Sequence, residues 1–599
     1  MAKLVTASWD QRSKHGRWPK RLQQGRFAAL MLPALLLGAC VAPSAAPASP
    51  SSTVLPLAAT ATTSPTPKPT STSTPVPTAT PVVSPHGDTL VYNIGSEPAS
   101  IDPARDRDTT EDFVDVQLNA TLVIPDANLN MKPGLAASWD LSPDGLTYTF
   151  HLRPDLKWSD GSPLTASDFV YSFTRLFRPP VASPYTHFIS GIVGAHAYAT
   201  STSTDPAELA ALRAAVGVTA PNDSTLVIRL VQPEAFFLST LADALAAPVK
   251  RSNVQQYGAQ AFQAPHEVGS GPFILKSWAH HSSMDLVPNA SYYGGPPAID
   301  LKLEMIGETS ATLAAYRGNT IDTDGAVGLT AADMATVRAD TQLRNDLFSY
   351  TELGTYFLQY DVAQPPFDRA LVRRALSYAI DREALVRTAL AGEGDPAASL
   401  VPPGMPGHLP GLGQTYDLNK AKALLALAGY PGGHGLPTNL VASYNNLPAW
   451  TRVMQFMRTE FSAVGLTIQL NPLDSASYFS AMRQHPSPMF RSGWLSDYPD
   501  PNDWYGLFVT GGTQNVGQWS NARYDDLVRQ AAQDLNQAER MRLYNQAAQI
   551  LMSDPPASWW YYPRRYRLVK PWVRGMVTTG MDGGLPGKYF IKDVTIAFG

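Results

Sequence analysis

The sequence predicts an α/β protein with more than one folded domain. Residues 454–464 have the apolar spacing of an amphipathic helix, and residues 466–470 alternate as a strand directly after them. Strand and helix patterns follow one another in this way along the second half of the chain, which is typical of an α/β lobe with binding loops at strand ends. At 599 residues, the chain is long enough to form several hydrophobic cores.

Local patterns support the individual elements of this prediction. Residues 146–152 alternate apolar and polar side chains after a proline–glycine turn, as in a half-buried hairpin strand. Thr165 is expected to start a helix, with Asp168 as its reciprocal capping partner. Asp381 is expected to cap another helix, and residues 417–428 read as a further helix that ends before a glycine.

Charge and cysteine content exclude several classes of protein. The formal net charge is -4, and basic residues gather at the amino terminus, so the remainder of the chain is mildly acidic. A nucleic-acid-binding protein is therefore not expected, because neutralising phosphates needs a basic surface. The chain has one cysteine, Cys40, which excludes a disulfide framework and a clustered cysteine metal site. We expect no cofactor and no metal.

The amino-terminal 39 residues have the pattern of a secretory signal peptide. A basic stretch over residues 1–26 precedes an apolar run over 27–37 that is too short to span a bilayer stably. The sequence LGAC at 37–40 resembles the bacterial lipobox, in which the cysteine is lipidated and becomes the mature amino terminus. This resemblance implies that Cys40 is lipidated and anchors the chain outside the cytoplasm, on the outer or periplasmic side of the cell membrane.

Residues 40–86 are predicted to be a disordered tether. They consist almost entirely of Ala, Pro, Ser, Thr and Val and contain no aromatic residue. Such a segment cannot bury enough apolar surface to offset its ordering entropy. Its prolines favour extended polyproline II conformations, so we expect a semi-rigid stalk that holds a folded body away from the membrane.

The segment FRSGWLSDYPDP at 490–501 combines groups suited to holding a zwitterion. Gly493 lets another backbone approach closely, and Trp494 offers a flat apolar surface. Asp497 can pair with a cation, whereas Arg491 can hold a carboxylate with its planar fork. The two prolines end the strand in a rigid loop. Opposite charges near the ends of a short strand suit an extended peptide.

This segment resembles the signature of the oligopeptide- and dipeptide-binding receptors of ATP-binding cassette importers, the extracellular solute-binding proteins of family 5. Residues 95–103, 133–177 and 269–278 resemble the same family. The resemblance implies a two-lobed α/β fold of the periplasmic-binding-protein type (class II, cluster C) with an extra small domain inserted in the first lobe. The expected divisions are a signal peptide (1–39), a tether (40–86), lobe I (87–130, 246–347 and a return at 564–599), the inserted domain (131–245) and lobe II (348–563).

The resemblance also implies roles for particular residues. Asp497 matches the aspartate that pairs with the amino terminus of the ligand, and Arg491 matches an arginine that can meet its carboxylate. Tyr185 matches a tyrosine that reaches the ligand from the small domain. Some relatives carry a tryptophan ahead of the signature that stacks on the ligand, whereas residues 474–478 of this chain contain none; whether Tyr478 takes its place, and with it which side chains are accepted, stays open. The implied partners are a peptide and the permease subunits of an importer, with the receptor acting as a monomer.

Two alternatives use the same residues differently. One is a receptor of the same fold for a non-peptide solute such as an oligosaccharide or nickel. The other is a stalked extracellular glycosidase or peptidase in which Asp497 and Asp500 form a catalytic carboxylate pair. The sequence contains no zinc-protease, phosphate-loop or serine-hydrolase motif, so we do not expect an enzyme.

Overall fold

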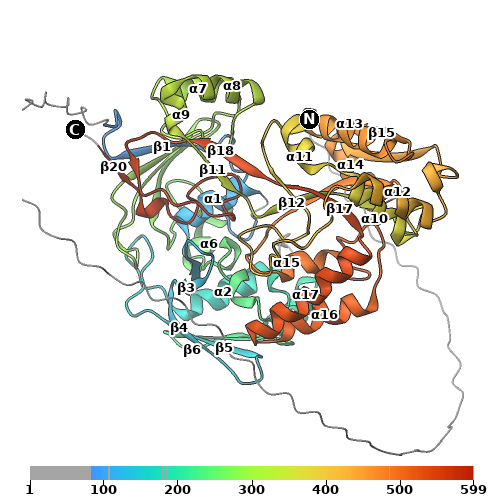
Figure 1. The fold of residues 1–599 in the computed structure, drawn as a ribbon. Helices are drawn as coiled ribbons and strands as arrows, with labels where there is room; N and C mark the ends of the chain where they lie inside the picture. The colour runs from blue at the N-terminus through green and yellow to red at the C-terminus, as the bar shows by residue number, and fades with distance from the viewer. Residues whose placement is uncertain (1–82, 106–107, 179–180, 182–185, 485, 598–599) are drawn as a thin grey trace, which may run out of the picture. The chain divides into compact units, whose positions relative to one another are not determined.

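A computed structural model describes residues 83–597, apart from 106–107, 179–180, 182–185 and 485 (Figure 1). The predicted signal peptide, nearly all of the predicted tether and the predicted lipidation site Cys40 lie outside the described residues, as does Tyr185.

The first sheet has four strands in the order β1-β10-β9-β8. Its one parallel pair is β1 with β10, and the other neighbours run antiparallel. Helix α1 contributes Phe113, Val114 and Leu118 to the same core as Leu90 and Tyr92 of the sheet. The bounds are β1 (Thr89–Asn93), α1 (Thr109–Leu118), β8 (Phe273–Ala279), β9 (Ser283–Pro288) and β10 (Asp300–Glu304).

The second four-stranded sheet is antiparallel throughout, in the order β4-β5-β7-β6. The predicted hairpin strand is confirmed as β5, whose Tyr148, Phe150 and Leu152 are buried. The helix expected from Thr165 is also confirmed, and Asp168 completes its capping box. The bounds are β4 (Ala136–Leu141), β5 (Thr147–Leu152), α2 (Ala166–Leu176), α3 (Ala195–Ala199), α4 (Pro206–Ala214), β6 (Val218–Asn222) and β7 (Thr225–Arg229).

The largest sheet has six strands in the order β13-β17-β12-β16-β14-β15. It is mixed, because β14 runs parallel to β15 and β16 while β12 runs antiparallel to β16 and β17. The bounds are β12 (Gly354–Tyr360), β13 (Asp395–Pro396), β14 (Leu440–Asn445), β15 (Ile468–Leu473), β16 (Met489–Leu495) and β17 (Ala557–Tyr562).

Helices on this sheet share a core with it that includes Leu376, Leu425 and Met457 (Figure 1). The predicted caps Asp381 and Asp417 are confirmed, since each carboxylate accepts a backbone N–H bond at the start of its helix. The predicted helix at 454–464 begins earlier, because a proline occupies its first turn. The bounds are α10 (Ala370–Ala379), α11 (Arg382–Ala384), α12 (Leu418–Leu427), α13 (Pro448–Ser462) and α14 (Ser475–Gln484).

A further core forms where two helices, α16 and α17, pack against each other and against aromatic residues that include Trp504 and Trp559. The bounds of these two helices and of the short helix that carries Trp504 are α15 (Asn502–Tyr505), α16 (Ala522–Gln533) and α17 (Gln537–Ser553). Shorter elements complete the described fold: β2 (Val123–Pro125), β3 (Met131–Pro133), α5 (Phe237–Thr240), α6 (Arg251–Tyr257), α7 (Thr309–Arg317), α8 (Ala331–Ala339), α9 (Thr341–Asp346), β19 (Val573–Arg574) and β20 (Thr595–Ile596).

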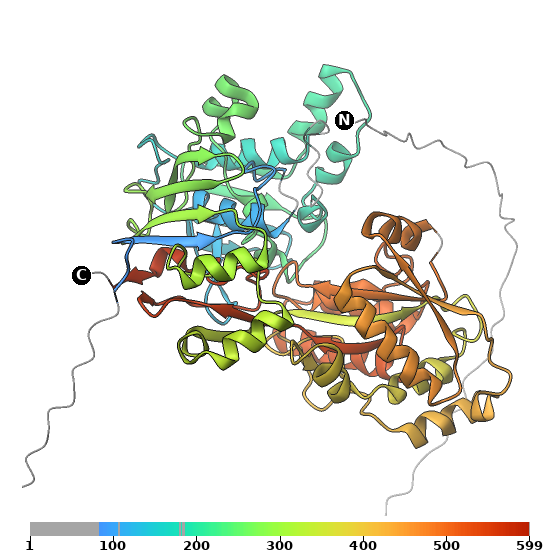
Figure 2. The same cartoon turned by 90° about the horizontal axis from the view of Figure 1, so that it is seen from above.

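A two-stranded ribbon joins the first sheet to the six-stranded sheet. Strand β11 (Leu347–Thr351) pairs with β18 (Arg564–Leu568), and the same two chain segments continue as β12 and β17 (Figure 2). At the other end, Thr323 bridges to Tyr92 of β1 and to Val569 just after β18. Only Glu352 and Leu353 separate β11 from β12, so this short connection lies where the ribbon enters the larger sheet.

Candidate ligand-binding site

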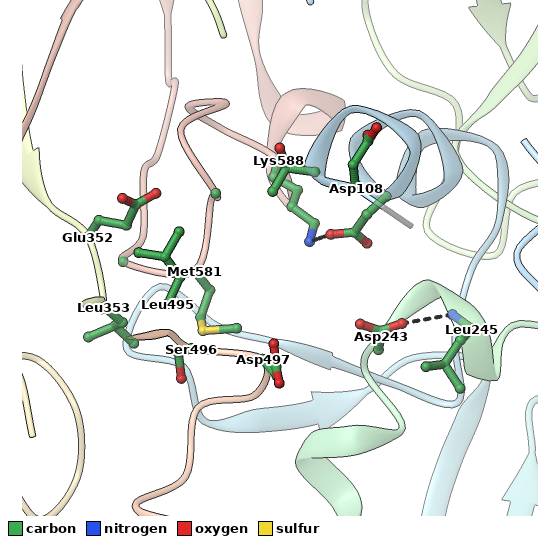
Figure 3. Close-up of a pocket in the computed structure, with 14 residues that line it drawn as sticks. Asp108, Asp243, Leu245, Glu352, Leu353, Leu495, Ser496, Asp497, Met581 and Lys588 are labelled. Carbon is green, nitrogen blue, oxygen red and sulfur yellow. Dashed lines mark hydrogen bonds and ion pairs between the residues drawn. The ribbon is translucent and has the colours of Figure 1, made fainter. Parts of the chain in front are cut away.

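Asp497 follows β16 and lines a cavity of about 340 Å³ whose other charged residues come from distant segments (Figure 3). Strand β16 pairs with β12 over its whole length, which fixes where the loop after it begins. We call this space the acidic cavity; its charged lining residues are Asp108, Asp112, Asp243, Glu352, Asp497 and Lys588.

Two of the five carboxylates in the acidic cavity have a cation beside them. Lys588 forms an ion pair with Asp112, and the Arg565 guanidinium pairs with Glu352 at 2.5 Å. Asp108 accepts the backbone N–H groups of Thr110 and Glu111 and so caps α1. Among the described residues, no Lys, Arg or His pairs with the remaining two carboxylates. The cavity therefore contains two carboxyl groups, those of Asp243 and Asp497, whose ionised forms have no ion-pair partner among the described residues.

The Asp497 carboxylate accepts no hydrogen bond from any described residue, although its backbone N–H donates to Asp503 at 2.9 Å. Asp503 is buried and also accepts bonds from the Ser496 hydroxyl and the Trp494 indole. Burial raises the pKa of Asp497 to about 8, and the nearby charges of Asp503 and Asp243 add to this shift. A cation bound in the cavity would remove this penalty on the ionised form.

The other predicted residues of the segment line a second cavity, of about 330 Å³. Arg491, Gly493 and Trp494 belong to it, together with aromatic side chains that include Phe357 and Phe508. We call this space the aromatic cavity. The structure thus separates Asp497 from the three residues predicted to act with it, because the acidic cavity contains none of them.

The Arg491 guanidinium lies against the faces of two rings, Trp450 and Tyr356, that do not themselves line the aromatic cavity. Its guanidinium carbon is 3.8 Å from the ring centroid of Trp450 and 5.1 Å from that of Tyr356. No carboxylate in the described part of the chain forms an ion pair with Arg491, and its Nε has no hydrogen-bond partner there. Cation–π contacts stabilise such a charge while leaving its N–H donors available for an anion.

Gly493 is required for a different reason from the one expected. A Cβ atom at this position would lie 2.2 Å from Cδ1 of Tyr356, so the glycine makes room for a ring rather than for a second backbone. Tyr478 is 1% exposed and donates its hydroxyl proton to the Arg491 carbonyl. It lines the aromatic cavity and fixes the backbone of β16.

The carboxylate pair Asp497 and Asp500 does not share a cavity. Asp500 is 8% exposed and accepts two hydrogen bonds from Arg540, at 2.7 and 2.9 Å. Its charge is neutralised by that arginine on α17, whereas the acid beside Asp497 is Asp503. The arrangement needed for two carboxylates to act on one glycosidic bond is therefore absent from these two residues.

Sequence reasoning did not identify four residues that define the acidic cavity: Asp108, Asp243, Glu352 and Lys588. They belong to four separate segments, and none stands in a motif that indicates ligand binding. A partial signal existed for Asp503, which lies in the same loop region as Asp497.

Within the described residues, no group of three His, Cys, Asp or Glu side chains is arranged to hold a metal ion. The helices of the described part of the chain are all too short or too polar to cross a bilayer.

Comparison with known proteins identifies the family. The sequence profile described as "Bacterial extracellular solute-binding proteins, family 5 Middle" matches residues 130–516. The chain is 29% identical to the probable deoxycholate-binding periplasmic protein YgiS of Escherichia coli (strain K12), over 81% of this chain and 90% of that protein. It is 28% identical to the periplasmic oligopeptide-binding protein OppA of the same strain, over 82% of this chain and 90% of that protein.

Solved structures agree with this assignment. The unliganded open form of the murein tripeptide-binding protein MppA has a TM-score of 0.74 and 28% identity, covering 86% of this chain and 98% of its own. Haemophilus influenzae OppA in complex with the peptide RPPGFSPFR has a TM-score of 0.66 and 25% identity, and the match covers 86% of this chain and 100% of that one. The fold is thus the predicted two-lobed periplasmic-binding-protein type, and the chain belongs to the bacterial extracellular solute-binding proteins of family 5.

Proposed function

We propose that this solute-binding protein captures peptides outside the cytoplasm, holds their amino end at Asp497 and delivers them to an ATP-binding cassette importer. The observation that carries the proposal is the ionisable carboxylate of Asp497, which lines the acidic cavity with no cation and no hydrogen-bond donor from the described residues. Relatives named for binding oligopeptides and murein peptides support the choice of a peptide.

The two cavities, lined by residues 491–494 and 495–497 respectively, suit the two ends of a short peptide. A free ammonium at Asp497 would form a charge-assisted hydrogen bond in a desolvated space, where such bonds are strongest. Arg491 would meet the carboxylate, because no carboxylate of the described chain forms an ion pair with it and aromatic rings already support its charge. Trp494 and the other aromatic residues would contact the peptide between these ends.

The remaining parts of the proposal concern the division of the chain into lobes, the hinge between them and the anchoring of the protein. We assign the sheet β1-β10-β9-β8 to lobe I, the sheet β4-β5-β7-β6 to the inserted domain and the six-stranded sheet to lobe II. The ribbon β11–β18 then serves as the hinge about which the lobes close on the ligand. Lipidation of Cys40, action as a monomer, the lack of catalysis and a role for Tyr185 belong to the same proposal, and each rests on the sequence and on resemblance to the family.

Calorimetry with matched peptides tests the central claim. Tri-alanine should bind the wild-type protein, and N-acetyl-tri-alanine, which has no ammonium, should bind far more weakly. Asp497→Asn should weaken tri-alanine by about 2–5 kcal/mol, because removing one partner leaves a desolvated charge unpaired. Asp526→Asn, an exposed carboxylate on α16 outside both cavities, is the matched control. Equal affinity of the wild-type and Asp497→Asn proteins for tri-alanine would refute the role of Asp497.

A non-peptide ligand is the second candidate, and one comparison favours it. A relative with 29% identity is named as a probable deoxycholate-binding protein, and the aromatic cavity offers ring surfaces beside Arg491 for an amphipathic carboxylate. Deoxycholate therefore belongs in the same calorimetric panel. Tight binding of deoxycholate that Arg491→Gln abolishes, together with no binding of any peptide, would establish this alternative.

A further inference from the structure

Asp243 is a second carboxylate of the acidic cavity that forms no ion pair with a described residue, although the charge of Lys588, whose ion pair is with Asp112, partly offsets the rise in the pKa of Asp243 that burial causes. It precedes the 3-10 turn Ala244–Ala246, and its Oδ1 accepts the backbone N–H of Leu245 at 2.9 Å. Figure 3 shows its carboxylate facing the same space as that of Asp497. The two groups are close enough for the charge of Asp243 to raise the pKa of Asp497. A ligand that neutralises only Asp497 therefore leaves a charge unpaired.

The cations beside the cavity are fewer than its five carboxylates. Lys588 is already engaged by Asp112, and Arg565 is engaged by Glu352. Glu352 is 1% exposed, and Arg565 reaches only its Oε2, so its Oε1 is without a hydrogen-bond partner among the described residues. Closing such a space around a single ammonium would bury uncompensated negative charge, which is costly unless a partner is present.

The uncharged lining indicates the shape of the missing partner. Leu245, Leu353, Leu495 and Met581 line the same cavity as the carboxylates (Figure 3). Lysine and arginine side chains combine an aliphatic stem, which packs on apolar surface, with a charged head that requires polar partners. The acidic cavity presents both kinds of surface together.

We propose that the natural ligands are peptides carrying a lysine or arginine at the first or second residue, with the side-chain charge held by Asp243 while the amino terminus is held by Asp497. This inference rests on the proposed function and specifies its substrate class. Asp243 is then a specificity-determining residue, distinct from the residue that anchors every peptide.

Isothermal calorimetry with four tripeptides tests the inference: Lys-Ala-Ala, Ala-Lys-Ala, Ala-Ala-Lys and Ala-Ala-Ala. The better of the first two should bind the wild-type protein about tenfold or more tightly than Ala-Ala-Ala, as expected for one charge-assisted hydrogen bond in a desolvated space. Ala-Ala-Lys should show no such gain. Acetylating the lysine side chain of the preferred peptide should remove the advantage, because the chain length is kept while the charge is lost.

Variants separate this inference from the proposed function. Asp243→Asn should abolish the preference for lysine, so that the lysine peptides and Ala-Ala-Ala bind this variant with equal affinity, and Asp497→Asn should weaken all four peptides. Asp526→Asn should change neither property. If Ala-Ala-Ala binds but neither amino-terminal lysine peptide binds more tightly, the inference is wrong and the proposed function stands. If no tripeptide binds, the proposed function fails and the inference fails with it.

Discussion

The acidic and aromatic cavities adjoin the same segment of chain but hold charge in opposite ways. They have similar volumes, about 340 and 330 Å³. The acidic cavity is lined by five carboxylates and one lysine, whereas the aromatic cavity is lined by Arg483 and Arg491 and by no carboxylate. A difference of this kind along one segment favours a ligand with a positive end and a negative end.

The stabilisation of the two charges also differs. Arg491 lies over Trp450 and Tyr356, so ring faces stabilise its charge before any ligand arrives. Asp497 is buried beside other acids, and its pKa is raised by that burial first and by the charges of Asp503 and Asp243 second. The fold thus prepares the Arg491 end of the site for its ligand group, whereas the Asp497 end depends on the ligand for neutralisation.

The largest effect after loss of Asp497 is expected for Arg491→Gln. A peptide that places its carboxylate at this residue should bind about 2 kcal/mol more weakly, the size of a hydrogen bond to a charged group. Its carboxamide derivative should bind wild-type and variant proteins equally. Calorimetry with free and amidated peptides of three to five residues measures this, and Arg529→Gln on the exposed face of α16 is the control. If amidation leaves the affinity of the wild-type protein unchanged for peptides of every length tested, Arg491 does not hold the peptide carboxylate.

A smaller effect is expected from Gly493→Ala, which tests the packing behind Arg491. The new Cβ would overlap the Tyr356 ring, and that ring is confined by Trp450 and Tyr561 at centroid distances of 4.8 and 5.1 Å. Overpacking of this kind costs about 1–3 kcal/mol of unfolding free energy. Gly506→Ala is the matched control, because nothing lies within 4 Å of its Cβ position. Urea unfolding of both variants measures the loss of unfolding free energy, and equal stabilities would contradict the confinement of Tyr356.

The smallest effect is expected on the pH dependence of the free energy of unfolding, through Asp497 of the acidic cavity. Burial raises the pKa of Asp497 to about 8 and that of Asp503 to about 7, whereas unfolded aspartates titrate near 4. Between these values the ligand-free folded state holds protons that the unfolded chain has released, so the free energy of unfolding falls as pH rises from about 4 to 8. Asp497→Asn should reduce this fall, by on the order of 1 kcal/mol.

Urea unfolding at pH 5 and pH 8 provides the measurement. Other buried acids also titrate in this range, so the quantity of interest is the difference in pH dependence between the wild-type and variant proteins. Asp526→Asn controls for the loss of a surface charge. An identical pH dependence in the wild-type and Asp497→Asn proteins would mean that Asp497 is ionised throughout, and the contrast with Arg491 would then be weaker than we describe.

The sequence by itself determined the local elements that need only near neighbours. Thr165 with Asp168, Asp381 and Asp417 mark helix starts correctly, because each cap acts on backbone N–H groups within a few residues along the chain. The alternation at 146–152 identified a strand, since strand side chains point alternately to opposite faces. The resemblance at 490–501 also identified the family, which the comparisons confirm.

Only the tertiary structure decided how charges meet. Asp108, Asp243, Glu352 and Lys588 join Asp497 from separate elements, and no local pattern indicates such a gathering. The structure also assigned Arg491 to a different cavity and Asp500 to an ion pair with Arg540. The physical reason is that the ionisation of a carboxylate depends on its burial and on the charges around it. Both are set by segments that are distant in sequence and become neighbours only in the folded chain.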